Sequence, residues 1–158
     1  MRPCAKHPSE PAVPVRPARI LVADDDEGFR CLITAVLADA GFTVNAASDG
    51  QQAWEALLDE RYDLLITDNE MPRLAGPQLI ERIRDAGMSL PVVIASGSFP
   101  MEKVRDHPEL QIAAALPKPF RVSELLNAVR EVFQASCADP AADQGLLHQL
   151  RECPQLIR

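Results

Sequence analysis

The sequence predicts an α/β domain in which helices cover both faces of a doubly wound, five-stranded parallel sheet. Short apolar runs alternate with stretches of helical period through residues 18–135. The third and fourth runs are apolar on both faces, as parallel strands buried between helices are. Alternation of this kind implies a right-handed, doubly wound sheet, with ligands at the carboxyl ends of the strands near a topological switch point. The strand order that we expect is the flavodoxin-like 2-1-3-4-5.

The predicted elements follow one another in a regular order. The candidate strands are RILVA (19–23), FTVNAA (42–47), LLIT (64–67), VVIA (92–95) and IAAAL (112–116). Helical period between them predicts helices around Phe29, Leu32, Ile33, Val36 and Leu37, around Trp54, Leu57 and Leu58, around Leu79, Ile80 and Ile83, and from Val122 to Phe133. Gly41 ends the first helix, and Pro108 limits a short helix at residues 100–107 to about two turns.

The two ends of the chain differ in composition from its middle. Residues 1–17 contain five prolines, which disfavour helix and sheet bonds and predict an extended, disordered lead-in. The domain itself is expected at residues 18–135. Residues 136–158 form a C-terminal tail, in which Leu146, Leu147 and Leu150 are spaced for one face of a short helix.

Charge and cysteine content narrow the class of protein. The net charge is −7, with 16 basic and 23 acidic residues, which argues against a nucleic-acid surface and fits a basic protein partner or a divalent cation. The four cysteines form no CxxC pair, so we expect a reducing cytoplasm, with Cys31 in the core on an apolar helix face. No apolar run approaches the roughly 20 residues that span a membrane.

Polar residues gather directly after the predicted strands. The first strand ends in Asp24, Asp25 and Asp26, the third in Asp68, and Ser96 and Lys118 follow the fourth and fifth. In the order 2-1-3-4-5 the first and third strands are neighbours, so their carboxylates crowd together. Two carboxylates about 4 Å apart repel by roughly 4 kcal/mol at an effective dielectric constant near 20. Lys118 supplies one compensating charge, and a hard divalent cation, magnesium above all, is expected to supply the rest.

These residues resemble the receiver domain of two-component response regulators, and the pattern is similar to that of the single-domain chemotaxis regulators. The resemblance covers about residues 18–135. Its motifs, in order and at the family's spacing, are ILVADDD, YDLLITDNEMPRLAG, PVVIASG and LPKPF. It implies a flavodoxin-like fold.

The resemblance also implies a role for each site residue. Asp68 would be the phosphoacceptor, and Asp24 and Asp25 would hold magnesium, with Asp25 binding it directly. The remaining implied features are the backbone carbonyl of Glu70 as a metal ligand, Ser96 and Lys118 as partners of the phosphoryl group, a cis bond between Lys118 and Pro119, the small Gly97, and the loop glycine Gly76.

The implied partners are proteins. His7, His107 and His148 lie in expected tails or loops, so the phosphoryl donor should be a sensor histidine kinase or a phosphotransfer protein. The output should be phosphorylation-dependent binding to a downstream protein or phosphate relay, without DNA binding. Homodimerisation through the face of the fourth helix, fifth strand and fifth helix is a further expectation. We expect no enzymatic activity beyond autophosphorylation from a phosphodonor and autodephosphorylation.

Two alternatives remain open. One is a degenerate receiver that acts only as a protein-binding module, although every site residue is present. The other is a haloacid-dehalogenase-like phosphatase. The order of the motifs in that class is imitated by Asp24 and Asp26, then Ser96, then Lys118. That class leaves Asp68 unexplained, and Asp26 is better suited to the N-cap of the first helix.

One position departs from the receiver family. Receivers commonly carry an aromatic residue three positions before the lysine, whereas this chain has Ala115. The sequence therefore predicts altered coupling between Asp68 and the face that carries the fifth strand.

Overall fold

The computed structural model of the chain describes residues 16–97 and 108–137. Its sheet has five parallel strands in the order β2-β1-β3-β4-β5, so the predicted fold class and strand order are confirmed. The strands are β1 (Arg19–Ala23), β2 (Thr43–Ala47), β3 (Leu64–Asp68), β4 (Val92–Ser96) and β5 (Ile112–Pro117).

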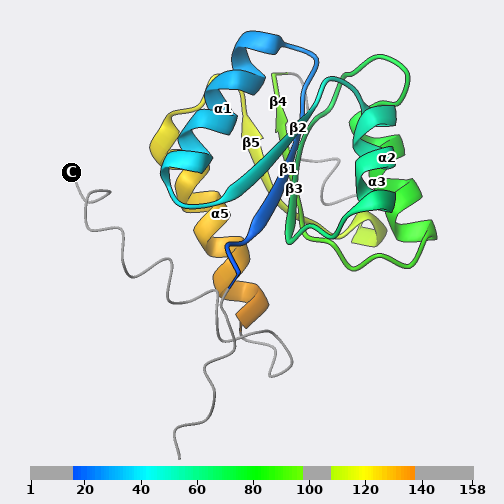
Figure 1. Cartoon of the computed structure of the whole chain (residues 1–158). Helices are drawn as coiled ribbons and strands as arrows, with labels where there is room; N and C mark the ends of the chain where they lie inside the picture. The colour runs from blue at the N-terminus through cyan, green and yellow to red at the C-terminus, as the bar shows by residue number, and fades with distance from the viewer. Residues whose placement is uncertain (1–15, 98–107, 138–158) are drawn as a thin grey trace, which may run out of the picture.

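Helices cover the sheet on both sides, with α1 and α5 on one face and α2 and α3 on the other (Figure 1). They are α1 (Glu27–Asp39), α2 (Gly50–Asp59), α3 (Gly76–Asp85) and α5 (Val122–Cys137), and a short 3-10 helix spans Pro108–Leu110. Among these helices none is long and apolar enough to cross a membrane.

The strands supply two apolar layers because successive side chains point to opposite faces. In β1, Ile20 and Val22 pack with α1 and α5, whereas Leu21 and Ala23 pack with α2 and α3. Phe133 of α5, 1% exposed, is among the largest side chains in the first layer. Burial of a side chain of this kind contributes about 1.5–3 kcal/mol to stability.

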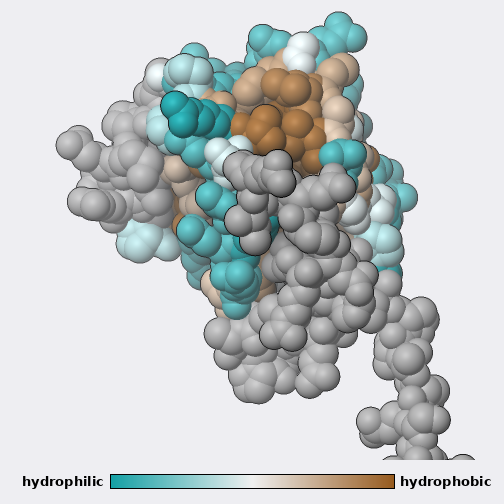
Figure 2. Space-filling view, turned by 90° about the vertical axis from the view of Figure 1, so that its left-hand side faces the viewer, coloured by the Kyte–Doolittle hydropathy of each residue, from teal (hydrophilic) through white to brown (hydrophobic). Residues whose placement is uncertain are grey.

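The prediction that Cys31 lies in the core is wrong. Cys31 is exposed, and the neighbouring Leu32 is 54% exposed. Ile33 and Leu37, one turn apart, are the buried residues of α1. Figure 2 views the side of α1 and α5 and shows apolar atoms gathered in one patch on it. The apolar residues of α1 therefore extend beyond the stripe that faces the sheet.

Several predictions fall outside the described residues. These are the helix expected at 100–107, the helix expected around Leu146–Leu150, and most of the lead-in at 1–17. Arg16, at the end of that lead-in, forms an ion pair with Asp63, at 2.9 Å between Nη2 and Oδ1.

Arg84 ties three segments together at the amino end of the sheet. Its guanidinium donates hydrogen bonds to the carbonyl oxygens of Met88 and Leu90, both at 2.9 Å, and to those of Leu110 and Gln111 at 3.0 and 3.2 Å. It thereby joins the end of α3 to the segments that enter β4 and β5. One planar cation satisfies four carbonyls that would otherwise need separate partners.

We expect Arg84→Met to lower the free energy of unfolding by about 3 kcal/mol, since hydrogen bonds from a charged donor are lost. Chemical denaturation measures the loss. Arg61→Met is a matched control, because Arg61 is exposed and its removal should change stability little. Equal stabilities of the two variants would show that Arg84 does not hold these segments.

Candidate functional site

The site lies where β1 and β3 end side by side. Ala23 pairs with Thr67 in the sheet, so the next residues, Asp24 and Asp68, are neighbours. Together with Asp25 they place three carboxylate oxygens within 4.8 Å of one another. Asp24 is buried, Asp68 is partly buried and Asp25 is exposed. The crowding predicted from the strand order is therefore present.

Lys118 reaches this cluster from the end of β5. Its Nζ lies 2.6 Å from Oδ2 of Asp24 and 3.3 Å from Oδ1 of Asp68. The same ammonium group lies 4.1 Å from the centroid of the Phe29 ring, on α1. A cation over an aromatic face is attracted by its electrons, so Phe29 adds a contact to the two ion pairs.

Local hydrogen bonds fix the orientation of the Asp24 segment. Oδ1 of Asp24 accepts from the backbone N–H of Asp26 at 2.9 Å, and Arg30 donates to the carbonyl oxygen of Asp24 at 2.7 Å. Asp26 caps α1 by accepting from the N–H of Phe29 at 2.9 Å, which confirms the predicted N-cap. The turn after β1 is thus held by its own backbone and by the first turns of α1.

Burial and charge act against each other at Asp68. Burial raises the pKa of the Asp68 carboxyl above its usual range, Lys118 lowers it, and Asp24 raises it again, with a net rise. Two carboxylate oxygens within 4.8 Å of each other repel by about 3.5 kcal/mol or more at an effective dielectric constant near 20. Ionised Asp68 is therefore held at an energetic cost to the fold.

Ser96 and Gly97 complete the end of the sheet between β3 and β5. Ser96 is 5% exposed, and its carbonyl oxygen accepts from the N–H of Lys118 at 2.8 Å. The Lys118–Pro119 peptide bond is cis, as the sequence resemblance implied. Among the described residues, none has an atom within 4 Å of a Cβ added to Gly97.

The loop after β3 passes close beneath Asp68. Gly76 donates its N–H to the carbonyl oxygen of Asn69 at 3.0 Å. A Cβ at Gly76 would lie 2.2 Å from the carbonyl oxygen of Asp68, so only glycine fits there. Glu70 lies in this loop with an exposed side chain.

Sequence reasoning missed three contributors to this end of the molecule. Phe29, predicted only as a residue of the first helix, contacts Lys118. Arg30, which the sequence did not single out, donates to the carbonyl oxygen of Asp24. An ion pair between Asp49 and Arg73 was not anticipated either. Asp49 carries a signal, because Asp between a strand and a helix is typical of an N-cap. No local pattern pointed to Arg73.

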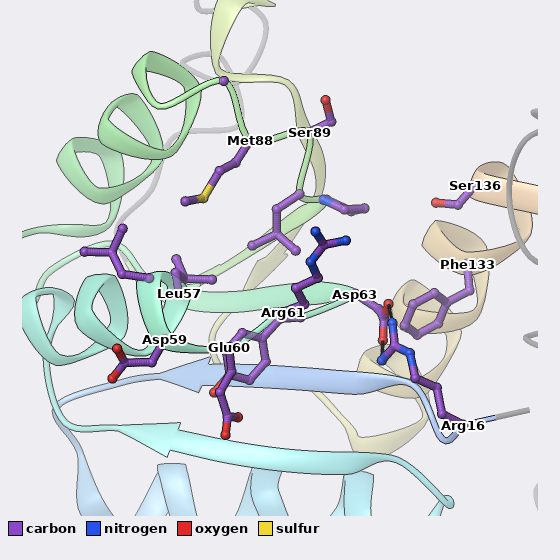
Figure 3. Close-up of a pocket in the computed structure, with 15 residues that line it drawn as sticks. Arg16, Leu57, Asp59, Glu60, Arg61, Asp63, Met88, Ser89, Phe133 and Ser136 are labelled. Atoms are coloured by element: carbon purple, nitrogen blue, oxygen red, sulfur yellow. Dashed lines mark hydrogen bonds and ion pairs between the residues drawn. The ribbon is translucent and has the colours of Figure 1, made fainter.

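A cavity of about 930 Å³ lies at the opposite, amino end of the strands (Figure 3). Its lining includes Asp63 and Pro91, which directly precede β3 and β4, and Arg16, which precedes β1. The sticks in Figure 3 show the Arg16–Asp63 ion pair beside Phe133. None of the predicted site residues lines this cavity.

The raised pKa of Asp68 generates a stability prediction. A carboxyl whose pKa in the folded protein is raised above its usual value destabilises the fold at higher pH, and this effect is lost as pH falls through the folded-state pKa. Asp68→Asn should therefore raise the Tm by a few degrees at neutral pH in chelator, a change on the order of 1 kcal/mol. The gain over the unmodified chain should shrink toward pH 4. Calorimetric scans at both pH values measure it.

Glu81→Gln is the matched control, because Glu81 is an exposed carboxylate on α3. Its Tm should stay close to that of the unmodified chain. A Tm of Asp68→Asn at or below that of the unmodified chain at neutral pH would contradict the electrostatic cost described above.

Comparisons with known proteins agree with this geometry. The family model described as the response regulator receiver domain matches residues 20–130. Response regulator MprA of Mycolicibacterium vanbaalenii is 31% identical over 136 residues, which cover 82% of this chain and 56% of that protein. Transcriptional regulatory protein DltR of Streptococcus agalactiae is 34% identical over 113 residues, covering 71% and 50%. The chain spans about half the length of these relatives.

Solved structures show the same fold. The chemotaxis protein CheY4 of Vibrio cholerae superposes with a TM-score of 0.69 at 27% identity, covering 74% of this chain and 99% of that one. The response regulator TrrA of Thermotoga maritima, solved in complex with Mg(2+)-BeF, has a TM-score of 0.65 at 26% identity, covering 73% and 98%. On the family match, the relatives and the fold, the chain belongs to the response regulator receiver domain family.

Proposed function

We propose that this receiver takes a phosphoryl group from a sensor histidine kinase or a phosphotransfer protein onto Asp68. The observation that carries the proposal is the convergence of Asp68, Asp24, Asp25 and the Lys118 ammonium at one end of the sheet. Phosphoryl transfer requires positioning and charge neutralisation more than covalent work by the protein. A preformed cluster of this kind meets that requirement.

The donor set fits magnesium. Asp24, Asp25 and Asp68 offer carboxylate oxygens within 4.8 Å of one another, and hard divalent cations prefer oxygen ligands. The net negative charge that Lys118 leaves at the cluster also favours a cation. Asp25, Asp24, Asp68 and the backbone carbonyl of Glu70 would hold the ion. When bound, magnesium supplies charge neutralisation for the phosphoryl oxygens.

The reaction at Asp68 is a phosphoryl exchange. A carboxylate oxygen of Asp68 forms a bond to phosphorus, the bond between phosphorus and the donor histidine nitrogen breaks, and that nitrogen keeps the electron pair. Lys118 is placed to pair with one phosphoryl oxygen, since its Nζ already lies 3.3 Å from Asp68. Ser96, at the adjacent strand end, would hydrogen-bond another. The product is an aspartyl phosphate.

The partners we propose are proteins. Two apolar residues, Leu32 on α1 and Val122 on α5, are 54% and 45% exposed and suit a docking partner with an apolar surface. The output would be phosphorylation-dependent binding of a downstream protein or relay of the phosphate, in the cytoplasm. The face around β5 and α5 would serve homodimerisation.

The phosphatase alternative meets a structural obstacle. It requires the carboxylate of Asp26 in the chemistry, whereas here that carboxylate caps α1 through the N–H of Phe29. Asp68, which that alternative leaves without a role, lies against Lys118 instead. Both contacts favour the receiver chemistry.

With magnesium and acetyl phosphate, the chain should gain one phosphoryl group, which alkaline treatment removes. Asp68→Asn should abolish the gain, and a chelator should prevent it, because the ion neutralises the developing charge. Intact-mass spectrometry measures the phosphate. Asp63→Asn is a control at the far end of β3 and should be labelled normally. Labelling that survives Asp68→Asn or chelation would contradict the proposal.

Ala115 generates a prediction about the response to phosphorylation. It lies on the face of β5 opposite Ala114 and Leu116, which pack toward α1 and α5, and it carries no ring that could move with Ser96. Since a ligand shifts an equilibrium only through interactions that differ between its states, the response should take another route. Beryllofluoride should change backbone amide NMR shifts most in residues 96–112 and little in 122–134. Equal changes in both segments would contradict this.

A further inference from the structure

The loop between β3 and α3, residues 69–75, is attached to the rest of the domain beyond its own ends. At one side the N–H of Gly76 closes it onto the carbonyl oxygen of Asn69. At the other side the carbonyl oxygen of Leu74 lies against Gly50, so closely that a Cβ there would be 2.0 Å away. The loop therefore rests directly on the first residue of α2.

Arg73 has an unusual backbone conformation in this loop. Its φ is +67°, in the left-handed region that residues other than glycine rarely adopt. The N–H of Leu74 donates to the carbonyl oxygen of Pro72 at 2.8 Å, so Arg73 is the central residue of a tight three-residue turn. Such a conformation is unfavourable for a residue with a side chain and persists only when its surroundings hold it.

The side chain of Arg73 supplies one such constraint. Its guanidinium forms an ion pair with the carboxylate of Asp49, whose side chain is 3% exposed against 57% for Arg73. A carboxylate this buried requires a partner, because removing a charge from water is strongly unfavourable unless the charge is compensated. The pair thus joins the long side chain of Arg73, in the loop, to a buried carboxylate of the domain.

Asp49 is itself firmly placed. As the N-cap of α2 it accepts hydrogen bonds from the N–H groups of Gln51 and Gln52, at 2.9 and 3.0 Å. Burial alone would raise the pKa of Asp49, but the hydrogen bond from Gln52 and the charge of Arg73 bring it below its usual value. The carboxylate is therefore a fixed, charged anchor at neutral pH.

We propose that Arg73 is a positioning residue for the metal site: by pairing with Asp49 it holds the conformation of loop 69–75, which carries the proposed backbone ligand at Glu70. The inference rests on the proposed function, because it assigns a support to one of the proposed metal ligands. Arg73 does not touch the reacting atoms. It acts three residues away along the chain, through the conformation of the loop.

The test is Mg²⁺ binding to the full chain by titration calorimetry. Partners that orient a metal ligand typically change affinity by 10- to 100-fold when lost. We expect Arg73→Gln to weaken Mg²⁺ binding by about tenfold, at the low end of that range, since a backbone ligand is affected indirectly. Arg73→Lys, which keeps the charge, should recover part of the affinity.

Whether the Mg²⁺ affinity of Arg73→Gln falls or rises distinguishes an effect on the position of the loop from an effect of the lost charge. Removal of a positive charge near a cation site strengthens cation binding by electrostatics alone, so weaker binding in Arg73→Gln can only reflect the loop. Asp49→Asn retains the capping oxygen of α2 and should weaken binding as well, both through the loop and through the loss of a negative charge, so it supports the result for Arg73→Gln without replacing it. The double variant should be no weaker than the more affected single variant, because both changes break one contact.

A control variant and an NMR measurement test the role of the loop independently. Arg61→Gln removes an exposed arginine far from the loop and should bind Mg²⁺ like the unmodified chain. Amide NMR shifts of Asn69 and Glu70 in chelator should move in Arg73→Gln and return toward their original values in Arg73→Lys. These shifts report the loop even if Arg73→Gln lowers the Tm.

Two outcomes would overturn the inference. Mg²⁺ binding by Arg73→Gln that equals or exceeds that of the unmodified chain, with unchanged Asn69 and Glu70 shifts, would overturn it while leaving the proposed function intact. An unmodified chain that binds no Mg²⁺ would overturn both.

Discussion

Repulsion between carboxylates at the ends of β1 and β3 is the constraint on which this site depends. Asp24 and Asp68 are brought together by strand pairing and cannot separate without disturbing the sheet. Lys118 relieves the repulsion in part, through contacts of 2.6 and 3.3 Å. The remaining negative charge is what makes the cluster suited to a cation and, with it, to a phosphoryl group.

The apolar core of the domain provides the stability that lets the fold tolerate these clustered charges. Strands β3 and β4 are buried on both faces, and two apolar layers fix their positions in the sheet. The polar residues of the site come after the last apolar residue of each strand. Stability therefore comes from the middle of the sheet, and the chemistry we propose is confined to its carboxyl edge, where strain and charge can be tolerated.

Loops at this edge are held by contacts that differ in kind. The turn after β1 is fixed by the Asp24 side chain, which accepts from the N–H of Asp26, and by Arg30, which donates to the carbonyl oxygen of Asp24. The approach of Gly76 to Asp68 depends on the absence of a side chain. The loop after β3 relies in addition on one ion pair, between Arg73 and Asp49. That pair links the segment next to the phosphoacceptor we propose with the start of α2, on the opposite side of β1.

Local pattern was sufficient for the fold and for the identity of the clustered residues. The apolar runs predicted all five strands to within one residue at their ends. The signal is clearest for β3 and β4, since strands buried between helices need apolar side chains on both faces. Asp24, Asp25, Asp68 and Lys118 could be grouped because chain order and strand order together decide which strand ends meet.

Only the tertiary structure decided which side of a helix faces the core and which residues distant in the sequence come into contact. The apolar stretch in α1 is wider than the stripe that one sheet face can cover, so period alone could not exclude Cys31 from the core. The Arg73–Asp49 pair joins residues 24 positions apart, and Lys118 lies over Phe29 from another strand end. Such contacts depend on how loops and helices pack in three dimensions, and a linear pattern carries no record of those distances.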